Sequence, residues 1–200
     1  MSVEPVRCWQ TADPLYQAYH DYEWGRPVLD ERGVYERLCL EGFQSGLSWL
    51  TILRKREGFR AAFAGFDPEA VARFGDREVT RLLGDASIVR HRGKIEATIA
   101  NARGVLALRE SGTPLHELFW AHAAERDRPG PASWDGWPSV TPESTALSKA
   151  LKKAGFRFVG PTTAYAAMQA CGVVNDHLLD CHVRDAVERD RRAQIGRAHV

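Results

Sequence analysis

The feature of this sequence that most constrains its fold is a repeated helix-start signal, an aspartate or threonine directly before a proline. Such a side chain caps the first N–H groups of a helix, and proline suits the first helical position. The three instances are Asp67-Pro68, Thr113-Pro114 and Thr141-Pro142. Apolar residues recur every three or four positions from Arg92 to Leu108, and Gly172 ends a helical stretch from Pro161 to Cys171. Comparable strand signals do not recur, so the sequence predicts an all-α fold.

Length and cysteine content limit the class of protein further. A chain of 200 residues can bury about 70% of its unfolded surface without disulfides. The four cysteines, at positions 8, 39, 171 and 181, lack the spacing of a small disulfide framework, so we expect free thiols or metal ligands. No apolar run reaches the roughly 20 residues of a membrane span, and the N-terminus lacks the hydrophobic region of a secretory signal. We expect a cytoplasmic monomer without membrane contact.

The net charge of +1 does not by itself indicate a nucleic-acid partner, which usually shows in the overall charge balance. Basic residues nevertheless form three clusters. They are Arg54, Lys55, Arg56 and Arg60; Arg90, Arg92 and Lys94; and Lys149, Lys152 and Lys153. For any single cluster, a solvated helix face is the favoured interpretation.

The stretch VNDHLLDC places His177 and Cys181 four residues apart, the spacing at which two side chains share a face of an α-helix. One interpretation is that the pair forms half of a metal site, with Cys8 and His20, near the other end of the chain, as candidates for the other half. The alternative is a surface helix that carries both residues without a metal.

Glu41 is a carboxylate on an apolar stripe. It shares with Val34 and Leu38 a helix face that should point inward, where a carboxylate is costly unless it is paired. On this pattern alone, a partly exposed salt bridge to Arg37 is favoured. The nearby aromatic residues, which alone would indicate core packing, are Tyr16, Tyr19, Tyr22, Trp24 and Trp49. Together with a buried carboxylate, aromatic faces are what a pocket for a flat, cationic heteroaromatic ligand requires.

The segment GFRFVGP contains a short hairpin after Gly155. The helix that follows from Pro161 leaves unpaired backbone N–H groups near Gly160, and such a helix start suits a phosphate. An ordinary tight turn between packed helices is an equally good interpretation.

Five segments, in order, resemble the 3-methyladenine DNA glycosylase I family. They are RCW, DPLYQAYHDYEWGRPV, LEGFQSGLSWLTILRKREGFRAAFAGFDPEAVA, IVRHRGKIEATIANA and ALSKALKKAGFRFVGPTTAYAAMQACGVVNDHLLDC. The resemblance extends from about Arg7 to Cys181 and is weakest in the Pro/Gly/Ser-rich loop around 126–143. It implies a helix-hairpin-helix glycosylase that flips a 3-methylated adenine out of double-stranded DNA and hydrolyses its N-glycosidic bond. No lysine nucleophile follows the hairpin, so we expect no strand cleavage.

The resemblance also implies roles for individual residues. It implies one structural zinc, joining the chain ends of a two-lobed molecule, with the ligands Cys8, His20, His177 and Cys181. It implies a base pocket with Glu41 as the partner of the flipped base and with walls formed by Tyr16, Tyr19, Trp24 and Trp49. The DNA-binding residues would be Gly46 and Leu47, which fill the gap left in the DNA, and Lys153 and Gly160, which hold phosphates.

The expected mechanism relies on binding. Asn175 stands where many related glycosylases carry an aspartate that stabilises the developing sugar cation. Because 3-methyladenine is already a cationic leaving group, the enzyme needs mainly to bind, orient and admit water, with electrostatic help from Glu41. Two other classes stay open: a zinc-containing module that recognises lesions without cutting, and a non-enzymatic resistance or scaffolding relative. A carboxylate inside an aromatic pocket favours the enzyme.

The C-terminal residues QIGRAHV, at 194–200, do not continue the resemblance. We therefore expect residues 1–193 to form one glycosylase unit, in which a zinc-joined lobe of the two chain ends adjoins a central helical lobe. We expect 194–200 to be a non-native or disordered tail.

Overall fold

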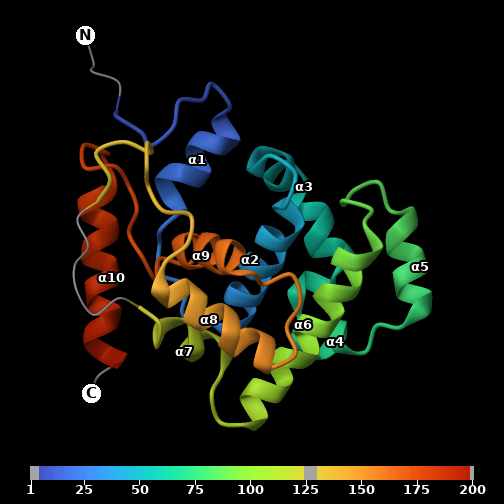
Figure 1. The fold of residues 1–200 in the computed structure, drawn as a ribbon. Helices are drawn as coiled ribbons and strands as arrows, with labels where there is room; N and C mark the ends of the chain where they lie inside the picture. Colours follow the sequence, from blue (N-terminus) through green and yellow to red (C-terminus); the bar gives the residue numbers. More distant parts are fainter. Residues whose placement is uncertain (1–4, 124–129, 199–200) are drawn as a thin grey trace.

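The computed structural model describes residues 5–123 and 130–198, and within these ranges the chain is helical without strands (Figure 1). The predicted all-α class is therefore confirmed. The elements are α1 (Pro14–Tyr22), α2 (Glu31–Gln44), α3 (Trp49–Ala62), η1 (Ala64–Phe66), α4 (Pro68–Ala72), α5 (Asp76–Gly84), α6 (Arg92–Glu110), α7 (Leu115–Trp120), α8 (Pro142–Lys153), α9 (Pro161–Ala170) and α10 (Arg184–Ala198). None of the described helices is both long and apolar enough to cross a membrane.

Two of the three predicted helix starts are confirmed. The Asp67 side chain accepts hydrogen bonds from the first turn of α4, and Thr141 caps α8 by accepting one from the Ser144 N–H. The third prediction is wrong by one residue. Pro114 has an extended backbone (ψ 149°) and is itself the N-cap of α7, so Thr113 lies too far from the helix to cap it.

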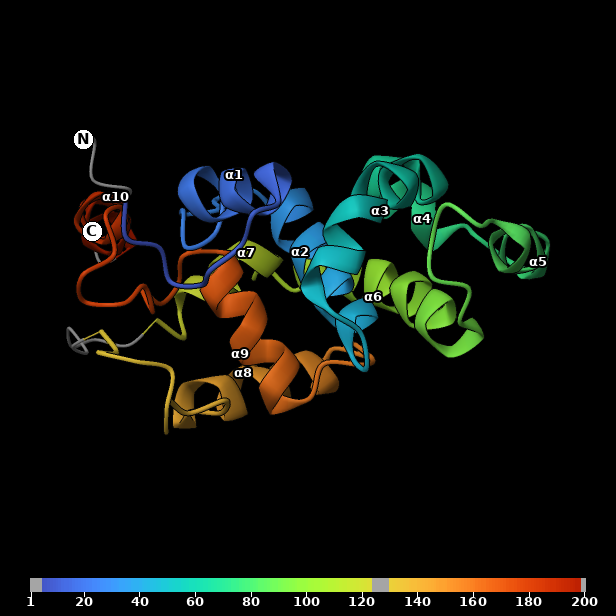
Figure 2. The same cartoon turned by 90° about the horizontal axis from the view of Figure 1, so that it is seen from above.

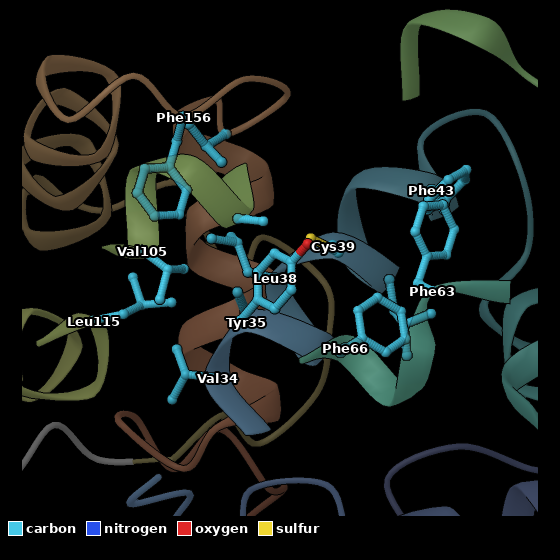
Figure 3. Packing of buried hydrophobic residues seen from close by; sticks show 14 of the residues in the cluster. Val34, Tyr35, Leu38, Cys39, Phe43, Phe63, Phe66, Val105, Leu115 and Phe156 are labelled. Carbon is cyan, nitrogen blue, oxygen red and sulfur yellow. The ribbon is translucent and has the colours of Figure 1, made fainter. Parts of the chain in front are cut away.

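The main core is built around α2, which packs against α3, α6, α7 and α9. Figure 3 shows Tyr35 and Leu38 at its centre. Phe43, Phe63 and Phe66 lie on one side of them, and Val105, Leu115 and Phe156 lie on the other. The hydroxyl of Tyr35 donates a hydrogen bond to Thr98 O on α6 (2.8 Å), so even the polar atom of this ring is satisfied. This packing makes α2 a rigid support for the residues on its last turns.

A second, smaller core joins the two ends of the chain. The N-terminal segment lies near the start of α10, on one side of the molecule (Figures 1 and 2). The His182 N–H donates to Val6 O (3.1 Å), and Arg26 forms an ion pair with Asp190 of α10 (2.6 Å). The buried members of this core are Cys8, Tyr19, Trp24, Leu53, Ala170, Cys181, Val183 and Val187.

The C-terminal helix α10 continues through positions 194–198, while residues 199 and 200 lie outside the described residues. The expectation of a tail that does not belong to the glycosylase unit stays a prediction.

Candidate functional site

Four potential metal ligands from the two chain ends meet in the smaller core. Their ligand atoms all lie within 4.8 Å of one another, and all four residues are buried: Cys8, His20, His177 and Cys181. Cys8 Sγ lies 3.2 Å from His177 Nδ1, and Cys181 Sγ lies 3.4 Å from the same nitrogen and 3.5 Å from His20 Nε2. Ligands of a tetrahedral zinc are separated by about 3.3 to 3.8 Å. The donor set and its spacing therefore fit a zinc ion.

The predicted helix carrying His177 and Cys181 is wrong, because both residues lie in irregular chain between α9 and α10. After α9, Gly172 adopts a left-handed backbone (φ +71°) and passes so close to the N-terminal segment that a Cβ would lie 2.6 Å from Gly25 O. Asn175 Oδ1 then accepts the His177 N–H (3.3 Å), a local bond that competes with helix formation. The turn, rather than a helix face, brings the two ligands together.

The second nitrogen of each histidine ring is also engaged. His20 Nδ1 lies 2.8 Å from the carboxylate of Asp21, which is held by an ion pair to Arg7. His177 Nε2 lies 3.1 Å from Trp24 O. Hydrogen bonds of this kind fix the ring orientation of metal-binding histidines and select which nitrogen faces the metal.

The other two cysteines, Cys39 and Cys171, are buried in the main core. Burial raises the pKa of each thiol to about 12, so both stay protonated. They lie outside the ligand cluster, as the resemblance implied.

An aromatic cavity of about 190 Å³ lies next to the ligand cluster, between α1, the end of α2, the start of α3 and α9. It is lined by Trp9, Tyr16, Tyr19, Trp24, Glu41, Gln44, Trp49, Trp134, Ala166 and Gln169. The cavity thus brings together all five residues that the sequence assigned to the base pocket. The rings pack tightly, with centroid distances of 5.3 Å for Tyr19 and Trp49 and 5.1 Å for Trp9 and Tyr16.

Glu41 lies in the wall of this cavity and is 8% exposed. Within the described part of the chain no side chain or backbone group pairs with its carboxyl group, so the expected salt bridge to Arg37 is wrong. Burial raises the pKa of Glu41 to about 8, partly offset by the attraction of the Arg37 charge. A cation inside the cavity would favour the ionised carboxylate and lower this pKa again.

Five cavity residues were missed by the sequence analysis: Trp9, Gln44, Trp134, Ala166 and Gln169. A signal existed for the last two, because positions 166 and 169 are three apart and share a face of α9. Trp9 adjoins the candidate ligand Cys8, which places it near the N-terminal segment. Trp134 carried no such signal, since its place in the cavity wall depends on tertiary contacts, including a hydrogen bond from its Nε1 to Cys8 O (2.8 Å).

The residues expected to contact DNA lie outside the cavity. Gly46 has a left-handed backbone (φ +82°) and Leu47 is 42% exposed, and both lie in the loop between α2 and α3. Lys153 is the exposed last residue of α8, and Gly160 is the N-cap of α9, whose first turn has no side-chain cap. The hairpin between these two helices is fixed by Asn101, whose amide bonds both the N–H (2.7 Å) and the C=O (3.2 Å) of Arg157.

The three basic clusters differ in how far they are neutralised. On α3, Arg54, Arg56 and Arg60 each form an ion pair with an acidic residue. The cations around the hairpin are exposed and form no ion pair with a described residue: Arg90, Lys149, Lys152, Lys153 and Arg157. The hairpin is therefore surrounded by exposed cations that no described acidic residue neutralises.

Comparison with known proteins agrees with this geometry. A family model described as methyladenine glycosylase matches residues 9–185. The chain is 50% identical to DNA-3-methyladenine glycosylase 1 of Escherichia coli (strain K12) over 177 residues, which is 88% of this chain and 95% of that protein. A crystal structure of a 3-methyladenine DNA glycosylase I matches with a TM-score of 0.85 at 50% identity, covering 88% of this chain and 98% of that one.

A structure of 3-methyladenine DNA glycosylase I from Staphylococcus aureus, which concerns the recognition of 3-methyladenine, matches with a TM-score of 0.83 at 36% identity. It covers 87% of this chain and 93% of that one. The region matched by the family model contains every residue that lines the cavity and three residues of the ligand cluster, His20, His177 and Cys181, while Cys8 lies one residue before it. This chain therefore belongs to the methyladenine glycosylase family.

Proposed function

We propose that the protein is a DNA repair glycosylase that flips 3-methyladenine out of double-stranded DNA and hydrolyses its N-glycosidic bond. The observation that carries this proposal is the buried, unpaired carboxyl group of Glu41 in an aromatic cavity. A carboxyl group in this position costs free energy unless a ligand pairs with it. A cationic alkylated base supplies the missing charge, and its flat ring stacks on the aromatic walls at about 1 to 3 kcal/mol per face.

Binding and positioning account for most of the chemistry. The methylated base leaves as a neutral molecule, so the protein needs only to hold the flipped nucleotide, favour its charge through Glu41 and admit water. None of the residues that line the cavity is a lysine, so the cavity wall offers no amine for a covalent sugar intermediate. The enzyme is accordingly monofunctional and leaves the DNA strand uncut.

The position of Asn175 argues against a direct part in this chemistry. Its amide donates to Arg184 O (3.2 Å) and to the Glu188 carboxylate (2.9 Å), and it is absent from the cavity wall. These bonds connect the loop before His177 to α10. Asn175 therefore supports the ligand cluster.

The DNA lies across the face formed by the loop between α2 and α3 and by the hairpin between α8 and α9. Exposed Leu47 enters the gap left by the flipped base, as apolar wedges do in other DNA-binding proteins. The hairpin with α8 and α9 acts as a helix-hairpin-helix element, in which Gly160 and Lys153 contact phosphates. The unpaired cations around the hairpin support this placement.

A structural zinc is part of the proposal. Cys8, His20, His177 and Cys181 would supply two thiolates and two imidazoles, a complete tetrahedral set that leaves no open position for catalysis. When bound, the ion supplies a cross-link between the N-terminal segment and the segment after α9.

The test is release of free base from methylated DNA. Wild-type protein should release 3-methyladenine and leave abasic sites in uncut strands. Glu41→Gln keeps the shape but removes the negative charge, and Trp49→Ala removes a stacking face, so both should lose at least tenfold in kcat/KM while keeping their affinity for undamaged DNA. The matched control is Glu57→Gln, whose side chain is 79% exposed on α3.

The pH profile gives an independent check. Because the pKa of Glu41 is raised to about 8, kcat/KM should rise with pH up to about that value and then level off, and Glu41→Gln should flatten the profile. A protein that binds methylated DNA but releases no base would instead be a lesion-binding module. The assigned site would be contradicted if Glu41→Gln kept full base release while Asn175→Ala, still folded and zinc-loaded, lost it.

A further inference from the structure

Gln169 places a hydrogen-bond acceptor in the wall of the aromatic cavity. Gln169, on α9, lines the aromatic cavity and also a neighbouring cavity of about 230 Å³, and the two cavities share Trp134 and Ala166. Gln169 therefore stands where the two spaces meet, with its side chain partly exposed to them.

The amide of Gln169 is held in one orientation. Its Nε2 donates to Asp176 Oδ2 (2.8 Å), and the hydroxyl of Tyr165 donates to the same oxygen (2.5 Å). Asp176 is 3% exposed and lines neither cavity. A carboxylate only accepts hydrogen bonds, so the nitrogen of the amide must face Asp176. The carbonyl oxygen, Oε1, is then the end that is left for the cavity.

This oxygen has no donor within the described part of the chain. Resting on the function proposed above, we propose that Gln169 is a specificity-determining residue whose carbonyl oxygen accepts a hydrogen bond from the amino group of a flipped adenine-type base. Asp176 and Tyr165 are its positioning residues. Glu41 provides the charge that selects alkylated bases, and Gln169 provides the acceptor that selects an amino group.

The chemistry of the two purines makes this selection specific. At carbon 6 an adenine-type base carries an amino group, which donates, whereas a guanine-type base carries a carbonyl oxygen, which accepts. A carbonyl oxygen placed against Gln169 Oε1 would bring two acceptors together without a proton between them. A site that hydrogen-bonds a substrate group discriminates against analogues that lack it, because the buried partner stays unpaired.

The experiment compares release of 3-methyladenine and 3-methylguanine from methylated DNA. Gln169→Met keeps the length of the side chain but removes the acceptor. It should lower kcat/KM for 3-methyladenine about tenfold, as loss of one hydrogen bond does, and leave that for 3-methylguanine nearly unchanged. The control is Gln17→Met, whose amide bonds Thr11 O outside the cavity. An unchanged ratio of the two kcat/KM values in Gln169→Met would overturn the proposal.

Two further measurements separate this inference from its premises. Quenching of the cavity tryptophans by free 3-methyladenine reports the contact without any base release, and Gln169→Met should weaken that affinity about tenfold. If wild type binds the free base but releases no base from DNA, the glycosylase function is refuted and the Gln169 contact can still be tested by quenching. If wild type and Gln169→Met bind the free base with equal affinity, the Gln169 contact is refuted.

Asp176→Leu tests the positioning. This substitution releases the Gln169 amide, whose NH₂ group can then turn toward the cavity. The kcat/KM value for 3-methylguanine should therefore rise, and that for 3-methyladenine should fall. Asp176→Asn, which keeps an acceptor oxygen, should restore the original preference. A purely structural role would lower both activities alike and so contradict the positioning. Zinc content and Tm verify folding, and Gln169→Met decides the central proposal if Asp176→Leu does not fold.

Discussion

At the scale of single residues, the carboxyl group of Glu41 occupies a position that lowers the stability of the fold. The group is buried on α2 without a partner, and burial raises its pKa to about 8 from an ordinary value of 4.5. Folding must therefore keep a proton on this group at a pH where the unfolded chain has lost it. Sites that bind charged ligands often reduce stability in this way.

We therefore expect Glu41→Gln to stabilise the protein in alkaline solution. Between about pH 4.5 and pH 8 the native state binds more protons than the unfolded state, so wild-type stability falls as the pH rises through this window. Glutamine does not titrate. The free energy of unfolding of Glu41→Gln should exceed that of wild type by on the order of 3 kcal/mol at pH 8.5, and the difference should shrink near pH 5.

Urea unfolding of both proteins at the two pH values measures this difference. A gap that is the same at both would show that the Glu41 carboxyl group is not buried in its neutral form.

At the scale of elements, a buried lysine binds the backbone at the start of the loop that carries Leu47. Lys94, in the first turn of α6, donates from Nζ to Phe43 O (2.9 Å) and Ser45 O (2.6 Å), carbonyl groups at the end of α2. Helix ends leave such carbonyls without partners, and a cation there also complements the helix dipole. Burial lowers the pKa of Lys94, because removing the charged amine from water costs free energy.

Replacing Lys94 with methionine should loosen this loop. Two carbonyl groups would lose a charged donor, so we expect the free energy of unfolding to fall by about 2 to 3 kcal/mol and base release to slow with it. Arg92→Met is the matched control, because Arg92 lies in the same turn, is exposed and, among the described residues, pairs with Glu96 alone. Its stability should change by less than about 0.5 kcal/mol. Equal losses in the two variants would mean that the buried contacts of Lys94 do not hold the loop.

At the scale of the whole molecule, the ligand cluster closes the chain on itself. Cys8 and Cys181 come from opposite ends of the described sequence, yet their side chains meet beside the aromatic cavity. Two residues that line the cavity also adjoin the cluster. Trp9 follows Cys8 in the sequence, and the ring of Trp24 packs against that of His177. If this cluster binds the proposed zinc, loss of the metal would disturb the aromatic cavity as well as the fold.

Metal analysis of the purified protein should give one zinc per chain. A structural zinc supplies about 10 to 16 kcal/mol of apparent binding free energy, so Cys181→Ala should lose the metal and lower Tm far more than Cys171→Ala. Cys171 is an equally buried thiol in the main core, which makes it a matched control for loss of packing. A structural zinc would be contradicted if removing the metal from wild type left Tm unchanged, or if Cys181→Ala and Cys171→Ala lowered Tm equally.

The sequence by itself determined the class of fold and most of the cavity. Capping residues and prolines act within one helical turn, so the starts of α4 and α8 could be read from Asp67 and Thr141. Glu41 was identified as a carboxylate on an inward stripe, a property of periodicity alone. The resemblance to a known family then supplied the meaning of that position and the partners of His177 and Cys181.

Only the tertiary structure decided how these parts meet. Whether Glu41 pairs with Arg37 depends on the direction of both side chains and on the elements packed around them, and one helix does not fix that. Gly172 ended its helix as expected, but the segment that follows formed no helix around His177, because the chain there passes the backbone at Gly25 and Asn175 accepts the His177 N–H. The orientation of Gln169 depends on Asp176, seven residues away and beyond the end of its helix. Local sequence sets local backbone, whereas the pairing of polar groups inside the molecule is settled by contacts between segments that the sequence keeps apart.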